Sequence, residues 1–194
     1  MKKIILLTSI FSLFLANAFS QSCLGEGITF SKQSQIDVFP ALYAGCSVIK
    51  GDVTIMSGLD ITNLNGLSSI TNIEGHLWIN FNPQLTSLRG LHNLTSIGKH
   101  LELTNNDVLK DIKAFYALVK IGTYLRIDEN FMLLNFEGLN NLRSIGTDLR
   151  IMWNQQLTNI SALNGIEKIP GNLVIDNNNL LKNLEGLKIL SGCH

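Results

Sequence analysis

The sequence predicts an all-β solenoid: a right-handed parallel β-helix of six 24-residue coils with a short N-terminal capping helix. Apolar residues recur every 24 residues from Val53 onward without a gap. Within each period they are spaced by two and then by threes, whereas an amphipathic helix would alternate threes and fours. An asparagine also recurs at one point of successive periods, starting at Asn82. A long fixed period of this kind is typical of stacked coils.

Seven apolar columns define the repeat, and their positions are apolar in every period. The first column contains Val53, Leu77, Leu101, Leu125, Leu149 and Leu173, and Cys193 ends the seventh. Such order is not expected by chance in a chain with 45% hydrophobic residues. We expect these side chains to share one core, with a strand at each G-x-L-x-I segment and further extended segments at L-x-x-L and L-x-x-I. Strand spacing would be about 4.8 Å, and parallel crossovers favour the right-handed sense.

The turns carry asparagine and glycine. The asparagine column contains Gly58, Asn82, Asn106, Asn130, Asn154 and Asn178. Asparagine tolerates tight turns, and a stack of inward amides would bond turn backbone that is otherwise buried without partners. Another corner contains Gly66, Gly90, Ala114, Gly138, Ala162 and Gly186. We interpret both columns as structural.

The first 20 residues have the layout of a secretory signal peptide: Lys2 and Lys3, an apolar stretch, then small residues. Cleavage after Ala18 and cleavage after Ser20 both fit. A second apolar run of the roughly 20 residues that span a bilayer does not occur. We therefore expect a secreted or cell-surface protein without a transmembrane segment.

Residues 21–52 are predicted to form an N-terminal cap, since a solenoid needs its open ends covered. In an oxidising compartment Cys23 and Cys46 are expected to pair and staple this segment. Ser31 is expected to cap a short helix that runs to about Phe39 and is stopped by Pro40. Ile36, Phe39 and Leu42 would then cover the first coil.

Residues 53–194 would form the six-coil domain, which ends two residues short of its last period. No closing cap follows. We expect either a longer parent chain or a partner, such as a second copy, at this end. Cys193 would then either form a link or fill its column as a small buried hydrophobe.

The chain resembles the receptor L domain family, the leucine-rich right-handed β-helix of insulin-receptor and epidermal-growth-factor-receptor ectodomains and of bacterial surface proteins. The resemblance runs from Cys23 to Leu190 and rests on a cysteine pair flanking a short helix, on I-x-G-D-V-T-I at 49–55, and on L-T-S-L-R-G-L-H-N-L-T-S-I-G at 85–98. It implies a non-catalytic binding or adhesion module whose strand face is the contact surface. The absent closing cap departs from the family.

Residues beside the strand leucines should point outward, because side chains alternate along a strand. The residues predicted to form this binding face are His76, Trp78, His100, Glu102, Tyr124, Arg126, Asp128, Arg150, Met152 and Trp153. Aromatic and arginine side chains dominate contact energies at interfaces. A solvated sheet face with incidental aromatic residues is the alternative.

Charge and residue types narrow the range of functions that the sequence supports. The 15 basic and 15 acidic residues do not run in blocks, which argues against nucleic acid as a partner. His76, His100 and Glu102 form a poor metal site on an open face, so no metal or other cofactor is expected. Asp128, Asp148 and Asp176 are interleaved with arginines, which favours ion pairs over catalysis. We therefore expect a module that binds an extracellular protein or glycan, with a polysaccharide-active β-helix enzyme and a structural spacer as alternatives.

Overall fold

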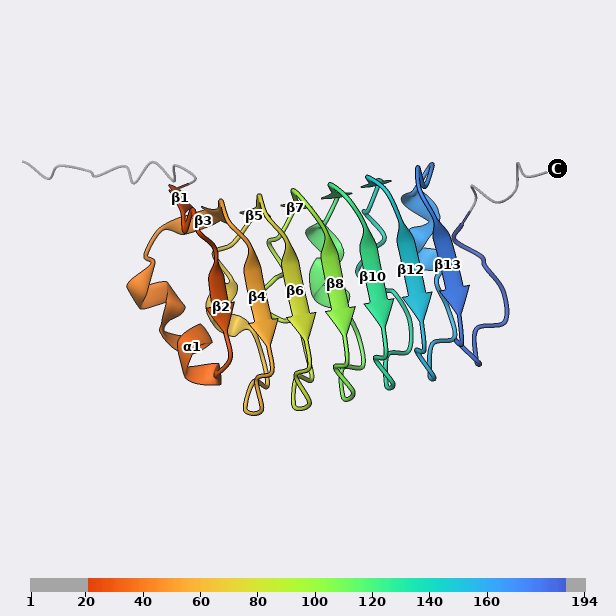
Figure 1. Cartoon of the computed structure of the whole chain (residues 1–194), viewed down its shortest axis with the longest axis horizontal. Coiled ribbons are helices and arrows are strands. Elements are labelled where there is room, and N and C mark those ends of the chain that lie inside the picture. The colour runs from red at the N-terminus through yellow and green to blue at the C-terminus, as the bar shows by residue number, and fades with distance from the viewer. Residues whose placement is uncertain (1–20, 188–194) are drawn as a thin grey trace, which may run out of the picture.

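A computed structural model describes residues 21–187 and contains two parallel sheets and one short α-helix (Figure 1). Along the seven-stranded sheet lie β2 (Ile28–Phe30), β4 (Val53–Met56), β6 (Leu77–Asn80), β8 (Leu101–Thr104), β10 (Leu125–Asp128), β12 (Leu149–Met152) and β13 (Leu173–Asp176). Along the six-stranded sheet lie β1 (Gln21–Cys23), β3 (Cys46–Ile49), β5 (Asn72–Ile73), β7 (Ser96–Ile97), β9 (Lys120–Ile121) and β11 (Ser144–Ile145). This arrangement is consistent with the predicted solenoid.

The strand register confirms that the leucine column stacks. Leu125 pairs with Leu101 on one side and with Leu149 on the other, and all three side chains are fully buried. The remaining apolar columns join the same hydrophobic core from Val53 to Ile166. The right-handed sense and a complete sixth coil stay predictions.

The asparagine column forms the predicted ladder inside the coil. Nδ2 of Asn106 donates to the carbonyl oxygen of Ile79 at 2.8 Å and to Oδ1 of Asn130 at 3.2 Å. The backbone N–H of Asn106 also donates to Oδ1 of Asn130, at 3.2 Å. The same pattern links Asn82 to Asn106, Asn130 to Asn154 and Asn154 to Asn178. Four of these asparagines, from Asn82 to Asn154, are fully buried, so the amides satisfy turn backbone that water cannot reach.

The left-handed residue of each turn is the one before the asparagine. Ser57, Phe81, Asn105, Glu129, Trp153 and Asn177 have φ between 53° and 59°. The sequence interpretation gave the tight turn to the asparagine itself. The asparagine amide is instead bonded inside the coil, and the preceding residue makes the reversal at the end of the strand.

The L-x-x-L segments differ from the expected extended conformation. In alternate coils they form short 3-10 helices, namely η1 (Asn65–Leu67), η2 (Lys113–Ala117) and η3 (Ser161–Gly165). In the coils between them Gly90, Gly138 and Gly186 have φ of 118°, 116° and 112°, values that side-chain-bearing residues rarely adopt. The alanines of this column, Ala114 and Ala162, lie in the 3-10 coils. The 3-10 coils thus carry Gly66, Ala114 or Ala162 in this column, whereas the coils between them carry a glycine with positive φ.

The N-terminal cap is held as predicted by a disulfide between Cys23 and Cys46, whose Cα atoms are 5.7 Å apart. Helix α1 (Gln33–Leu42) begins one residue later than expected, with Lys32 instead of Ser31 as its N-cap. It also contains Pro40, so the predicted end at Phe39 was wrong. Ile36 and Phe39 are buried as expected, whereas Leu42 is 68% exposed because the last turn extends past the first coil.

Burial decreases in the last described coil. Leu173, Ile175 and Leu181 are only partly buried, and Leu184 is 41% exposed although its column was expected to point into the core. The fall follows from position, because strand β13 is the edge of its sheet in the described chain. The predicted signal peptide, together with Leu190 and Cys193, lies outside the described residues. Within residues 21–187, no helix combines the length and apolar character needed to cross a membrane.

Candidate binding face

The outward side chains of the seven-stranded sheet form what we call the front face. Leucine and isoleucine of each strand point into the core, so Trp78, Glu102, Arg126 and Arg150 point outward from neighbouring strands in one register row. The row before it contains His76, His100 and Tyr124. These residues of the predicted binding face therefore lie side by side on this sheet, and their role in binding stays a prediction.

Aromatic rings stack along the row that precedes the strands. The ring centroids of His76 and His100 are 3.6 Å apart, and those of His100 and Tyr124 are 4.2 Å apart. Trp78 stacks on His76 at 4.8 Å with an interplanar angle of 18°. Strand spacing places each ring against the next, and the stack holds the rings in fixed orientations.

The histidines of this stack favour their neutral form. His100 is only 9% exposed. Burial, together with the adjacent His76 ring, lowers the pKa of His100 to about 4. Burial also lowers the pKa of His76, against the opposing effect of Asp52. Nδ1 of His76 and Nε2 of His100 are buried without a hydrogen-bond partner among the described residues, so a proton on either ring would be poorly solvated.

An ion-pair network lies beside the aromatic stack. Arg126 donates from Nε to Asp128, and its guanidinium is 3.9 Å from Oε1 of Glu102. Oε1 of Glu102 accepts from Nδ2 of Asn80 at 3.0 Å, and its Oε2 accepts from the hydroxyl of Tyr124 at 3.2 Å. The predicted interleaving of carboxylates with arginines is therefore realised as ion pairs.

Asp128 does not lie on the exposed surface as predicted. Its side chain is 1% exposed beneath Arg126, and Oδ1 accepts from the backbone N–H of Met152 at 3.0 Å. Burial raises the pKa of Asp128, although Arg126 opposes the shift. Asn80 and Thr104, which share its register row, are also buried. Only the central strands cover their residue of this row, because Met56 of β4 is 42% exposed and Met152 of β12 is partly exposed.

The C-terminal end of the front face, around β12, is more open to solvent. Arg150 donates from its guanidinium to Oδ2 of Asp148 at 3.4 Å, and both line a hollow of about 170 Å³ with Tyr124 and Arg126. Met152 is partly exposed at the end of β12. Trp153 is 46% exposed and follows β12 in the left-handed position, apart from the stacked rings.

A second hollow, of about 440 Å³, lies on the N-terminal part of the front face. It is lined by Thr29, Thr54, Met56, Trp78 and Asn80. The sequence analysis missed Thr29 because it treated residues 21–52 only as a cap. The signal was present: the I-T-F of β2 precedes the V-T-I of β4, but at a spacing of 25 instead of 24 residues.

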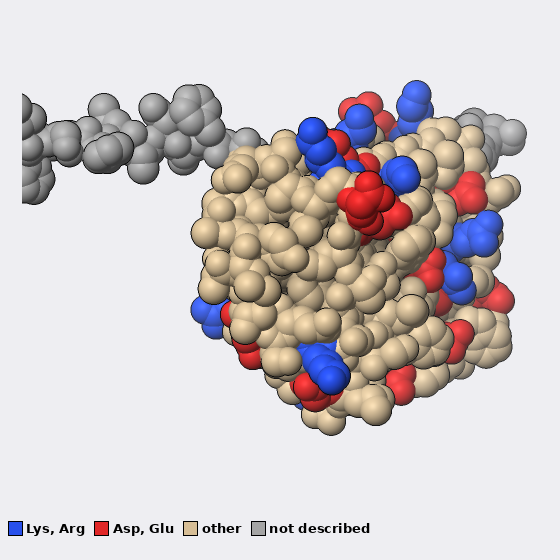
Figure 2. Space-filling view, turned by 60° about the vertical axis from the view of Figure 1, so that its left-hand side comes forward, with Lys and Arg blue, Asp and Glu red and all other residues tan. Residues whose placement is uncertain are grey.

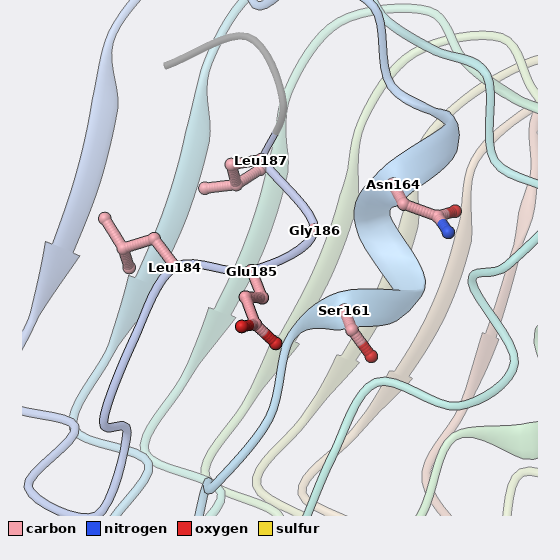
Figure 3. A pocket seen from close by; sticks show the side chains of 6 residues that line it. All are labelled: Ser161, Asn164, Leu184, Glu185, Gly186 and Leu187. Atoms are coloured by element: carbon pink, nitrogen blue, oxygen red, sulfur yellow. The ribbon is translucent and has the colours of Figure 1, made fainter. Parts of the chain in front are cut away.

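The predicted histidine and carboxylate neighbours do not form a metal-binding group in the described part of the chain. Residues 21–187 contain no group of three or more His, Cys, Asp or Glu side chains placed to hold a metal ion. A further hollow, of about 370 Å³, lies at the C-terminal end between η3 and the last described loop (Figure 3). It is remote in the fold from the front-face residues named above, and no predicted site residue lines it.

A comparison with protein families finds a match to the Receptor L domain over residues 45–108, the segment from the end of the cap through β8. That segment contains His76, Trp78, His100 and Glu102 of the front face. No curated protein sequence matches the chain significantly. Residues 45–108 are thus similar to the Receptor L domain family, in agreement with the resemblance that the sequence analysis described.

Proposed function

We propose that this chain is an extracellular recognition module that binds a protein or glycan partner on its front face. The Receptor L domain match supports a ligand-binding role, because members of this family are typically extracellular ligand-binding modules. The disulfide between Cys23 and Cys46 supports an oxidising, extracellular compartment. Export through the predicted signal peptide and a right-handed coil of six turns are part of the same proposal.

The observation that carries the proposal is the fixed cluster of aromatic and arginine side chains on one sheet. Trp78, His76 and Tyr124 are held by ring stacking, and Arg126 is held by Glu102 and Asp128. Side chains that are already ordered lose little conformational entropy when a partner binds, which favours affinity. Aromatic and arginine residues are also the types that most often dominate interface energies.

A binding role fits the carboxylates better than a hydrolytic one does. General acid–base catalysis requires a carboxyl group that reaches the substrate. Asp128 is buried under Arg126, and Asp148 accepts from Arg150 and from the backbone N–H of Asn172 at 2.8 Å. Glu102 is bonded to Asn80 and Tyr124. These partners keep the front-face carboxylates engaged within the protein.

Comparison of paired variants tests the proposal. The chain, produced by secretion, is screened on a glycan array and on an array of extracellular proteins, and dissociation constants of the ligands found are measured by surface plasmon resonance. We expect the Trp78→Ala/Arg126→Ala variant to weaken binding by about tenfold or more, the scale of a hot-spot residue. The control is Val119→Ala/Lys120→Ala, which removes an exposed apolar and a basic side chain at β9 of the other sheet.

Equal binding by the wild type and the front-face variant would place the contact surface elsewhere on the molecule. Turnover of a polysaccharide by the wild type would favour the alternative of an enzyme. A chain that binds nothing on either array would favour the structural spacer.

A further inference from the structure

We propose that the hollow around Trp78 binds an uncharged saccharide ring, with the indole as a platform and the hydroxyls of Thr29 and Thr54 as hydrogen-bonding groups. This inference rests on the proposed function, for which it names the ligand class. It adds a subsite that begins in the cap strand β2, outside the residues predicted from the sequence.

The hollow is built from neighbouring strands in register. Thr29 of β2 pairs with Thr54 of β4, and Thr54 pairs with Trp78 of β6, so the three lie in one row across the sheet. Met56 pairs with Asn80 in the row at the strand ends. Two strand spacings give a row about 10 Å long, and the volume of about 440 Å³ lies in the range of small-ligand sites.

No ionisable side chain lines this hollow. Figure 2 shows a broad surface without charged residues toward the N-terminal end of the molecule, with charged side chains gathered at its borders. Glu102, which pairs in register with Trp78, already accepts from Asn80 and Tyr124 and lies 3.9 Å from Arg126. A charged ligand would lose hydration here without gaining an ion pair, which favours a neutral one.

Trp78 is a fixed flat surface at one side of the hollow. Its ring stacks on His76 and lies 5.2 Å, at 52°, from the ring of His100. A pyranose ring presents a flat set of C–H groups on one face and hydroxyls around its rim. An aromatic plane matches that apolar face, because its contact is apolar and geometrically specific. Ordered in advance, the indole would lose little entropy on binding.

The polar groups of the hollow suit the hydroxyl rim. The hydroxyls of Thr29 and Thr54 make no hydrogen bond with other described residues, and a hydroxyl can both donate and accept. Asn80 differs, since its Nδ2 donates to Glu102 and its Oδ1 accepts from the backbone N–H of Thr104 at 3.2 Å. Asn80 thus shapes the floor, and the two threonines are available to a ligand.

The chain has two tryptophans, so one substitution makes the hollow observable by fluorescence. Trp153→Phe leaves Trp78 as the sole indole. We expect its emission to change saturably on titration with at least one neutral probe among cellohexaose, laminarihexaose, maltohexaose and chitohexaose. Oligogalacturonate of similar length, which is anionic, should give no saturable change.

A variant of the threonines tests the geometry within the same background. Thr29→Val/Thr54→Val keeps the shape and removes both hydroxyls, and we expect it to weaken saccharide binding at least tenfold. The matched control is Thr147→Val, which removes an exposed hydroxyl away from the hollow. Circular dichroism spectra equal to that of the parent would verify that each variant is folded.

Two results would overturn the saccharide assignment: no response to any neutral probe, and a response to oligogalacturonate alone. Its failure can be told apart from failure of the proposed function. If no neutral probe binds while Trp78→Ala/Arg126→Ala abolishes binding of a protein partner, the front face remains a binding surface and the saccharide subsite is refuted. If neutral probes bind through Trp78 while Trp78→Ala/Arg126→Ala binds a protein partner as tightly as the wild type does, the saccharide subsite stands and protein recognition by the front face is refuted.

Discussion

Replacement of Asn130 by alanine tests how strongly the asparagine ladder stabilises the coil. The Asn130 side chain is fully buried and makes four hydrogen bonds of 3.2 Å or less. Its Nδ2 donates to the carbonyl oxygens of Leu103 and Asp128, and its Oδ1 accepts from the backbone N–H and from Nδ2 of Asn106. Alanine removes all four and leaves their partners in a site that water does not reach.

The expected cost follows from these four bonds. An ordinary intramolecular hydrogen bond contributes about 1 kcal/mol net, and a buried group left without a partner costs about 1–3 kcal/mol. The carbonyl oxygen of Asp128 still accepts from the backbone N–H of Asn105, so the lower value per bond applies. We therefore expect the Asn130→Ala variant to lose about 4 kcal/mol of unfolding free energy.

Urea denaturation of the oxidised chain, followed by far-ultraviolet circular dichroism, measures this loss as a lower midpoint with an unchanged m-value. Asn141→Ala is the control, because Nδ2 of Asn141 donates to the carbonyl oxygen of Tyr116 at 2.7 Å in an exposed position. The control should lose at most about 1 kcal/mol. Equal losses in the two variants would refute the conclusion that burial of the ladder sets its contribution.

Three further predictions concern single positions. His100 has a folded-state pKa of about 4, below the unfolded value of about 6.5, so the unfolded chain binds the proton first. Its contribution to the unfolding free energy should therefore fall by up to about 3 kcal/mol as pH drops from about 6.5 to 4, and His100→Phe should flatten that part of a pH series of urea titrations. Gly66→Ala would place a Cβ against the carbonyl oxygen of Ile36 in α1, and a thermal melt should show a loss of about 2 kcal/mol from displacement of the cap. Phe81 has φ of 57°, which glycine adopts more easily than residues with a side chain do. Urea denaturation of Phe81→Gly should therefore show an unchanged unfolding free energy or one raised by up to about 1 kcal/mol, whereas the β-branched Phe81→Val should lower it. The opposite order would contradict the assigned turn strain.

The fold was predictable because its signal is repeated. Each strand leucine of the central coils was placed in the core from its column alone, and the register of Leu101, Leu125 and Leu149 confirms that assignment. The asparagine ladder was predictable for the same reason. A repeated pattern averages out the local preferences that make a single turn ambiguous.

Features that occur once were harder to predict. Pro40 was taken to end the cap helix, although that helix continues to Leu42. Burial of Asp128 was missed because strand alternation gives the direction of a side chain and not what covers it. Covering depends on Arg126 and on the backbone N–H of Met152 in the next coil. Thr29 was missed because its spacing to Thr54 is 25 residues, one more than the period.

The asparagine ladder also constrains how chains of this type vary in length. Each asparagine amide hydrogen-bonds within its own turn and to the backbone one coil before it. Removing or adding 24 residues at once would therefore restore every one of these bonds between the two coils that become neighbours. An insertion of any other length within the strands would leave two neighbouring turns unmatched. Natural variation is therefore expected to occur in whole-coil steps, and each added step would widen the exposed surface by one strand without redesign of the interior.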